Sequence, residues 1–144
     1  MYTFVPKEKY AKANGVNLNI STKSSVLICR KIRGKKLDFA EKFLNDLLEK
    51  KRSINGKYYT KTVREILKVL RSCASNAENL DLDMDNLIVH ASAHKGPTIK
   101  RRRRKSDFGN RMKITNIEIM LIEKKYEKNT VKNKGDMVER KINN

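Results

Sequence analysis

Two stretches that alternate between apolar and polar residues flank a long, strongly basic segment, and this arrangement constrains the fold most. Apolar side chains recur at every second position in residues 87–94 and again in residues 116–123, a pattern typical of half-buried β-strands. Between them, residues 95–113 hold nine lysines and arginines against one aspartate, a net charge of +8. Such a segment forms either an ordinary loop or a long protruding β-hairpin. A structureless loop of this length is uncommon in a compact domain, so we expect the hairpin.

The charge is unevenly distributed over the rest of the chain. The 144 residues contain 34 Lys and Arg against 16 Asp and Glu, which gives a net charge of +18. Residues 1–36 carry nine basic residues and one acidic residue, whereas residues 37–94 carry nine of each and are neutral. Self-repulsion of this size is normally relieved by a polyanion. Two basic segments around a neutral middle predict a folded core that docks onto nucleic acid.

The N-terminal part of the chain predicts a strand followed by a helix. Residues 16–20 alternate as Val-Asn-Leu-Asn-Ile and indicate a short half-buried strand. A helix is expected to begin with Ser21 or Thr22 as its N-cap, because both side chains can accept hydrogen bonds from first-turn amides. Gly34 suits the end of this helix, since glycine readily adopts the left-handed backbone found there.

Two further helices are predicted in the neutral middle, separated by a turn at residues 55–56. The second helix is expected to start with Asp38 and Glu41 in a reciprocal capping pattern, and the third with Thr62 and Glu65. Both carry apolar residues at helical spacing, which places one stripe on a core. The two stripes consist of Ala40, Phe43, Leu44, Leu47 and Leu48, and of Val63, Ile66, Leu67, Leu70, Cys73, Ala74 and Ala77.

The polar residues form no catalytic or metal-binding pattern, so we expect neither enzymatic activity nor a cofactor. His90 and His94 share one face of a predicted strand, but a metal site would need further ligands that the sequence does not offer. Cys29 and Cys73 form no closely spaced pair and indicate a reduced protein with both thiols in its core. No stretch approaches the roughly 18 apolar residues of a membrane span, and we expect neither a membrane partner nor a secretory signal.

The run from Arg101 to Lys105 is open to three interpretations: a nuclear localisation signal, a solvated charged loop, or the tip of an RNA-binding hairpin. Guanidinium groups present a planar fork of donors that suits phosphate oxygens, and they stack on exposed bases. The run is enclosed by two predicted strands instead of lying in a terminal tail, which favours the RNA-binding tip. We expect RNA to order this tip, and the free protein to leave it disordered.

Several short motifs, taken in order, resemble one known family. They are Arg33-Gly34, Ser75-Asn-Ala-Glu-Asn79, His94-Lys-Gly-Pro97, Phe108-Gly109 and Ile117-Glu118-Ile119. From about residue 7 to residue 124 the chain resembles the universal large-subunit ribosomal protein family twenty-two, called seventeen in the older eukaryotic naming. The His-Lys-Gly-Pro form is similar to that of the archaeal and eukaryotic branch. The connection at residues 52–60 is shorter than in the eukaryotic members.

The resemblance implies an α+β fold: three helices packed on a small three-stranded antiparallel sheet, with a long protruding basic β-hairpin. We expect four parts along the chain. They are a basic N-terminal extension with the first strand (1–20), a globular helical core with the start of the second strand (21–94), the basic hairpin with the closing strand (95–123), and a polar C-terminal tail (124–144).

The resemblance also implies a function, namely a structural constituent of the large ribosomal subunit that binds its RNA and lines the nascent-peptide exit tunnel with the hairpin. The partners implied are large-subunit ribosomal RNA, neighbouring ribosomal proteins and the nascent polypeptide, on cytoplasmic ribosomes after nuclear or nucleolar passage. The alternative is a nuclear nucleic-acid-binding regulator that uses the same basic segment. The residues expected to bind RNA are Lys7, Lys9, Lys12, Asn17, Lys23, Arg33, Lys35, Lys36, Lys57, Lys61, His94, Lys95, Lys100, Arg101, Arg102, Arg103, Arg104, Lys105, Arg111 and Lys113.

Overall fold

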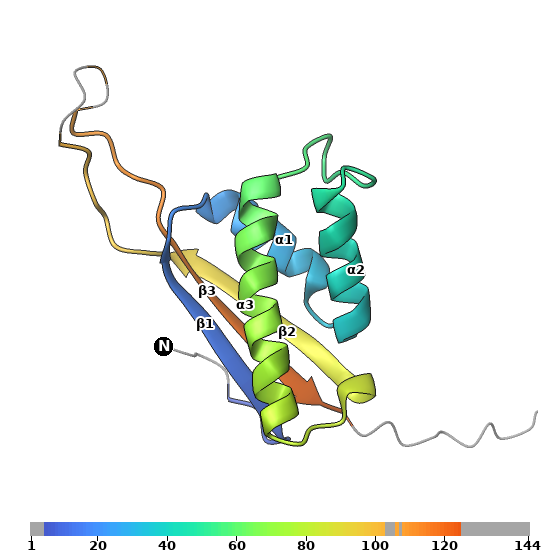
Figure 1. The fold of residues 1–144 in the computed structure, drawn as a ribbon. Helices are drawn as coiled ribbons and strands as arrows, with labels where there is room; N and C mark the ends of the chain where they lie inside the picture. The colour runs from blue at the N-terminus through green and yellow to red at the C-terminus, as the bar shows by residue number, and fades with distance from the viewer. Residues whose placement is uncertain (1–4, 103–105, 107, 125–144) are drawn as a thin grey trace, which may run out of the picture.

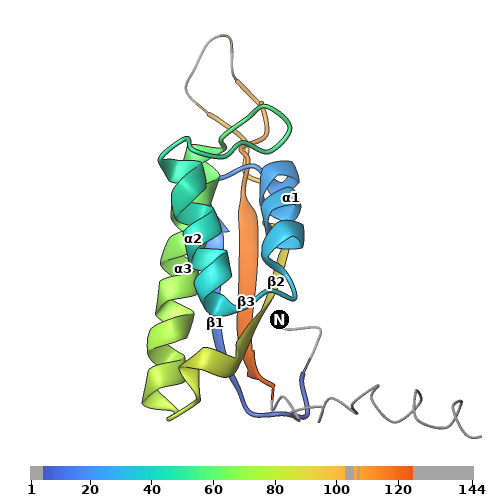
Figure 2. The same cartoon turned by 90° about the vertical axis from the view of Figure 1, so that its right-hand side faces the viewer.

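The computed structural model describes residues 5–102, 106 and 108–124, and it confirms the predicted α+β class. Three α-helices pack on a three-stranded antiparallel sheet (Figure 1). In chain order the elements are β1 (Tyr10–Leu18), α1 (Thr22–Ile32), α2 (Leu37–Leu48), α3 (Thr60–Asn79), a short 3-10 helix (Met84–Asn86), β2 (Leu87–Lys95) and β3 (Thr115–Glu123). Figure 2 shows α2 and α3 side by side, and the described residues between β2 and β3 reach beyond the ends of the helices.

The sheet has the order β1-β3-β2, so the last strand in the sequence lies in its centre. Both neighbours of β3 run antiparallel to it, with Ile119 opposite Ala13 on one side and Ala91 on the other. The two predicted strands are confirmed, and Val89, Ala91, Ile117 and Ile119 are fully buried. The central strand β3 is not half-buried as expected, because Glu118, Met120 and Ile122 on its other face are buried as well. The bounds of both strands differ from the expected ones by a single residue.

The first strand differs from its prediction. The alternation at residues 16–20 was expected to mark it, but β1 runs from Tyr10 to Leu18 and the side chain of Val16 is 58% exposed. The pairing shifts between Gly15 and Leu18, because Asn17 adopts a left-handed backbone with φ of 57°. This irregularity breaks the two-residue period. A Cβ on Gly15 would lie 2.8 Å from Cγ2 of Val69, so glycine lets α3 approach the strand.

Helix α2 begins two residues before the position that the capping pattern predicted, because its N-cap is Lys36 and not Asp38. The carbonyl of Lys36 accepts the first helical hydrogen bond from the amide of Ala40. Lys36 also pairs with Ile88 of β2, and this bridge fixes where the chain enters the helix. Asp38 therefore lies in the first turn, where its carboxylate interacts favourably with the helix dipole, and the predicted cap is wrong.

Helix α3 also begins earlier than predicted. Tyr59, with a left-handed backbone, is the N-cap, and its carbonyl accepts the amide of Val63. Thr62 was expected to cap the helix but is buried inside its first turn. Glu65, its expected partner, instead forms an ion pair with Lys68. Tertiary burial of Thr62 has outweighed the local capping preference.

The predicted end of the first helix and the turn before the third are confirmed. Gly34 has φ of 75°, directly after Arg33 closes α1. Asn55 and Gly56 both have positive φ, and Ile54 pairs with Lys57 across them. Two successive left-handed residues are typical of a tight hairpin turn.

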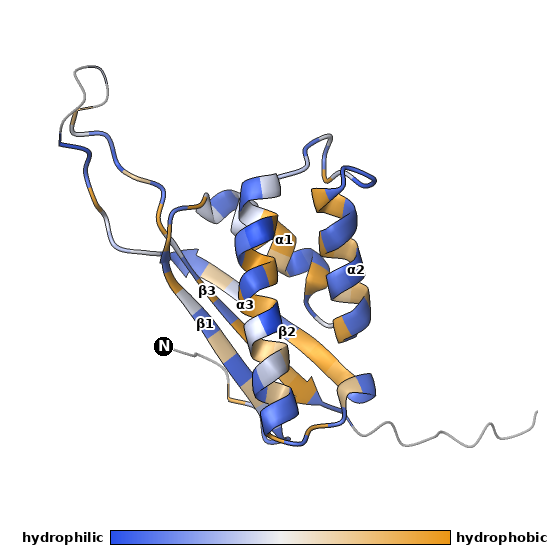
Figure 3. Ribbon diagram, in the orientation of Figure 1, coloured by the Kyte–Doolittle hydropathy of each residue, from blue (hydrophilic) through white to orange (hydrophobic). Residues whose placement is uncertain are grey.

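One hydrophobic core lies between the sheet and the helices. Figure 3 shows the apolar colour concentrated on β2 and on one side of each helix. Leu44, Leu47 and Leu70 are fully buried in this core. Cys29 and Cys73 are buried in it too, as predicted, and burial raises the pKa of Cys29 to about 12 and of Cys73 to about 11. Both thiols are therefore protonated and unreactive in the folded protein.

The free edge of β2 is covered by the link between α1 and α2. The amide of Gly34 donates to the carbonyl of Val89, whose own amide donates to the carbonyl of Lys35. Farther along the edge, Nε and Nη2 of Arg33 donate to the carbonyl of Ala91 at 2.9 and 2.7 Å. These bonds satisfy backbone groups that an edge strand would otherwise expose to other chains.

Replacing Arg33 by glutamine is expected to lower the free energy of unfolding by about 1–3 kcal/mol, because a charged donor to the strand edge is lost. Chemical denaturation monitored by circular dichroism would measure this change. Lys31→Gln is the matched control, since Lys31 is exposed in the last turn of α1, and it should change stability by less than about 0.5 kcal/mol. Equal changes in the two variants would show that the Arg33 bonds contribute nothing.

We call the segment between β2 and β3, residues 96–114, the extension, and its described residues project from the body. The regular pairing of β2 with β3 ends at Lys95 and Thr115. Beyond this point, the described residues form a single isolated bridge, Lys100 with Arg111, together with separate backbone bonds such as that from the amide of Met112 to the carbonyl of Ile99. The two arms thus stay together, but the described residues do not form the continuous β-hairpin that was predicted.

Candidate nucleic-acid interface

Most residues predicted to bind RNA lie within the described ranges, and every one of these is exposed. Arg103, Arg104 and Lys105 lie outside the described residues, so the structure does not test their predicted place at a hairpin tip. The exposed residues are Lys7, Lys9, Lys12, Asn17, Lys23, Arg33, Lys35, Lys36, Lys57, Lys61, His94, Lys95, Lys100, Arg101, Arg102, Arg111 and Lys113. They come from distant parts of the sequence. Several surround the extension and others lie near the opposite end of the sheet, whereas Lys12 lies within β1, opposite Met120.

The larger group surrounds the extension. Lys95 ends β2, and Lys61 lies in the first turn of α3 at the same end of the domain. Arg101, Arg111 and Lys61 line one hollow between the extension and the body. This end therefore combines cations from β2, from α3 and from both arms of the extension.

A smaller group lies at the opposite end of the sheet. Lys7 and Arg33 line a mostly apolar hollow of about 390 Å³ together with Ile88 and His90. Desolvation, together with the nearby Arg33 guanidinium, lowers the pKa of His90. His90 is therefore expected to be neutral near pH 7. The positive charge around this hollow comes from Lys7, Arg33 and Lys124, and Glu8 adds one negative charge.

Asn17 and His94 are tied to each other through Asn116 of β3. The amide of Asn17 donates to Oδ1 of Asn116 at 2.8 Å, and Nδ2 of Asn116 lies 3.3 Å from Nε2 of His94. These contacts join all three strands where the extension leaves the sheet. Both predicted residues thus fix the base of the extension in addition to any contact with RNA.

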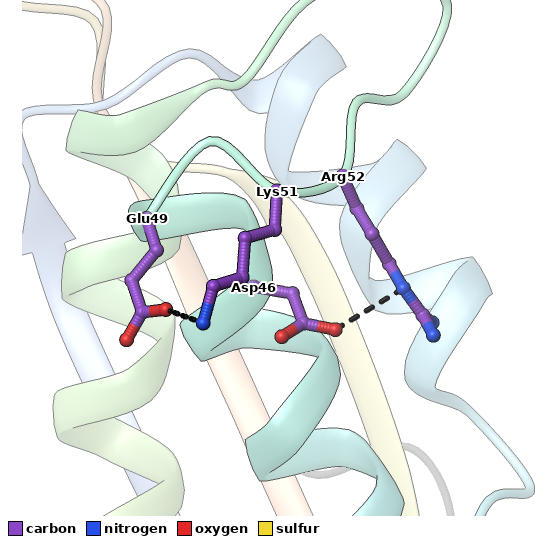
Figure 4. A network of polar contacts seen from close by, with 4 residues as sticks. All are labelled: Asp46, Glu49, Lys51 and Arg52. Carbon is purple, nitrogen blue, oxygen red and sulfur yellow. Dashed lines mark ion pairs between the residues drawn. The ribbon is translucent and has the colours of Figure 1, made fainter.

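The basic residues next to the α2–α3 connection are partly neutralised within the protein. Figure 4 shows Lys51 paired with Glu49, and Nε of Arg52 lies 3.1 Å from Oδ2 of Asp46. Exposed pairs of this kind contribute little to stability, but they reduce the positive charge that the connection presents. Lys57, farther along the connection, is exposed and was predicted to bind RNA.

Two apolar residues of the extension were not predicted as part of the interface. Phe108 is 72% exposed and Ile99 is 47% exposed, and both line a hollow with Arg102. Exposed aromatic side chains next to arginines are suited to stacking on unpaired bases. The sequence does show Phe108 as an isolated aromatic residue in a basic segment, but the prediction was based on charge and therefore did not include it.

Within the described ranges, no group of three or more His, Cys, Asp and Glu residues gathers as a metal site would require. None of the helices described is both long and apolar enough to cross a membrane.

A small α+β body with a basic extension and exposed cations around it is typical of proteins that associate with nucleic acid. A family model described as Ribosomal protein L22p/L17e matches residues 13–120, and the chain belongs to this family of structural, non-enzymatic ribosomal proteins. This membership favours the ribosomal interpretation over a nuclear regulator and associates the protein with the ribosome.

Individual relatives agree with the family match. The chain is 42% identical over 122 residues to the large ribosomal subunit protein uL22 of Archaeoglobus fulgidus, covering 69% of this chain and 79% of the relative. It is 40% identical to that of Methanosphaera stadtmanae, with the same coverage, and 34% identical to that of Sulfolobus acidocaldarius, covering 67% and 77%. The chain was predicted to resemble the archaeal and eukaryotic branch of the family, and these archaeal relatives support that prediction.

Proposed function

We propose that, as a structural constituent of the large ribosomal subunit, this protein binds large-subunit ribosomal RNA and lines the nascent-peptide exit tunnel with its extension. The observation that carries this proposal is the projecting extension, whose described cations come from both of its arms in a member of a ribosomal protein family. The partners are the RNA, neighbouring ribosomal proteins and the nascent polypeptide. The protein acts on cytoplasmic ribosomes, and in a nucleated cell it would pass through the nucleolus during assembly.

The contacts are expected to involve mainly the RNA backbone, because lysine and arginine dominate the exposed surface at both ends of the sheet. Phosphate contacts position a protein, whereas sequence is read at base edges. Asn17, His94, Phe108 and Ile99 provide a few candidate contacts to unpaired bases. The protein should therefore recognise the shape of folded RNA more than a linear sequence.

The affinity for a large-subunit RNA fragment is expected to fall steeply as salt rises, because phosphate contacts release counterions. The logarithm of the binding constant should fall with the logarithm of salt concentration by roughly 0.7–0.9 per phosphate neutralised. Filter binding between low and physiological salt would measure this slope. An affinity that does not change with salt would contradict the proposal.

Sedimentation tests the ribosomal assignment directly. In sucrose gradients of cell lysate, the protein should co-sediment in equimolar amount with large subunits and remain bound in moderate salt. Recovery with chromatin, or only in the slowly sedimenting fractions, would instead favour a nucleic-acid-binding regulator.

A further inference from the structure

A hollow of about 380 Å³ lies between the body and the extension, and every ionisable residue that lines it within the described ranges is basic. Lys61 comes from α3, Arg101 from the outgoing arm, and Arg111 and Lys113 from the returning arm. Its floor includes Ser21 and Thr62, whose side chains carry hydroxyl groups. The volume is within the roughly 300–1,000 Å³ typical of ligand pockets.

The backbone holds the two arms so that their cations face the same hollow. Lys100 pairs with Arg111, and the amide of Arg101 donates to the carbonyl of Asn110 at 3.0 Å. Next to this pairing, the amide of Met112 donates to the carbonyl of Ile99 at 2.8 Å. Local backbone bonds between the two arms therefore bring Arg101 and Arg111 to the same hollow.

Two helices begin at the hollow and add positive potential to it. Ser21 is the N-cap of α1 and Thr62 lies in the first turn of α3, yet neither helix has a side-chain cap bond or an acidic residue in its first turn. In contrast, α2 begins with Asp38 in its first turn. The uncapped amides and the helix dipoles attract an anion to the hollow, and so do the four basic side chains.

We propose that this hollow binds phosphate groups of the RNA backbone where a strand crosses between the body and the extension. The inference rests on the proposed function and specifies one place where it is carried out. Lys61 belongs to the rigid body, whereas Arg101 and Arg111 belong to the extension, so a phosphate shared by them fixes the direction of the extension relative to α3. Free inorganic polyphosphate has the same chemistry and is the competing source of the ligand.

The test compares two double variants of the full chain in binding to a large-subunit RNA fragment. Lys61→Gln/Arg111→Gln removes two cations of the hollow. Lys42→Gln/Arg71→Gln removes the same charges from exposed positions of α2 and α3. The hollow variant should bind at least tenfold more weakly than the control variant, and its salt slope should be shallower by about two contacts. Circular dichroism and thermal unfolding would establish that both variants are folded.

The outcomes separate this inference from the proposed function. If both double variants lost RNA affinity equally, the phosphate site would be overturned, but the proposal that the protein binds RNA would stand. A wild-type protein without salt-dependent affinity would instead overturn the proposed function.

A second measurement distinguishes the two sources of phosphate. Pyrophosphate is titrated into the wild-type protein while the amide resonances of Ser21 and Thr62 are followed by nuclear magnetic resonance. Shifts that the RNA fragment also produces, and that the hollow variant loses for both ligands, support an RNA phosphate site. Shifts with pyrophosphate alone would assign the hollow to a free polyanion and overturn the RNA assignment.

Discussion

Replacing Leu44 by alanine is expected to lower the free energy of unfolding by about 2–5 kcal/mol. Leu44 lies in α2, is fully buried and belongs to the core between the helices and the sheet. The truncation removes apolar contacts and leaves a cavity that the surrounding side chains fill only partly. Since domains of this size are stable by about 5–15 kcal/mol, the loss is a large fraction of the total. Urea denaturation should show a lower midpoint with an unchanged slope.

Two comparisons define what this result means. Leu67→Ala, in α3, should cost a similar amount, because Leu67 is buried in the same core. Arg102→Ala should change stability by less than about 0.5 kcal/mol, because Arg102 is exposed on the extension. Similar losses in all three variants would show that the extension is part of the folding unit.

Replacing residues 100–111 by Asn-Gly is expected to preserve the folded body and to impair RNA binding and late maturation of the subunit. The amide of Met112 donates to the carbonyl of Ile99, so two residues can close the gap as a tight turn. The change removes seven basic residues and one acidic residue from the chain. The melting temperature should change by only a few degrees, whereas the salt slope of RNA binding should become distinctly shallower. Calorimetry, filter binding and profiles of subunit precursors would measure the three effects.

A control keeps the length of the extension and removes part of its charge. Glutamine at both Arg101 and Arg102 should weaken RNA binding less than the deletion does, because the remaining cations and the exposed Phe108 are retained. Normal subunit maturation after the deletion would contradict the tunnel-lining role, even if the affinity for RNA fell.

Much of the fold follows from apolar periodicity. The alternation in residues 87–94 and 116–123 gave strands within one residue of the observed ones, because every second residue of each, such as Val89 and Ile119, faces the core. The starts of α2 and α3 did not follow from the capping residues. Lys36 is fixed by its bridge to Ile88, and Thr62 is buried by its surroundings. Both helix starts are therefore set by contacts between segments that are distant in the sequence, and the residues around each start do not reveal these contacts.

The sequence predicted which residue types form the candidate nucleic-acid interface, but not how these residues are arranged in space. Charge identified the basic residues, and all of those described are exposed. The hollow between Lys61, Arg101 and Arg111 depends on how α3 and the two arms approach one another, which no spacing in the sequence reveals. Arg33 was predicted only as an RNA contact, yet its guanidinium bonds to a strand carbonyl.

In the segment predicted as a hairpin, repulsion between basic side chains opposes regular pairing of the two strands. The alternation of apolar residues predicts pairing only where one face is buried, and the ladder ends at Lys95 and Thr115, where the extension leaves the core. Among the described residues farther out, the neighbouring cations repel one another, and no buried apolar face supports a regular ladder. Isolated backbone bonds such as the one between Met112 and Ile99 remain.

The position of β3 in the middle of the sheet determines when the protein can fold during synthesis. β1 and β2 do not pair with each other, and both require a strand that the ribosome makes after them. Until residues 115–123 have been made, the apolar faces of the helices lack the central strand that would cover them. Folding therefore depends on long-range pairing, which is slow compared with local helix formation. A chain whose synthesis stalls before Thr115 would leave these faces open to aggregation.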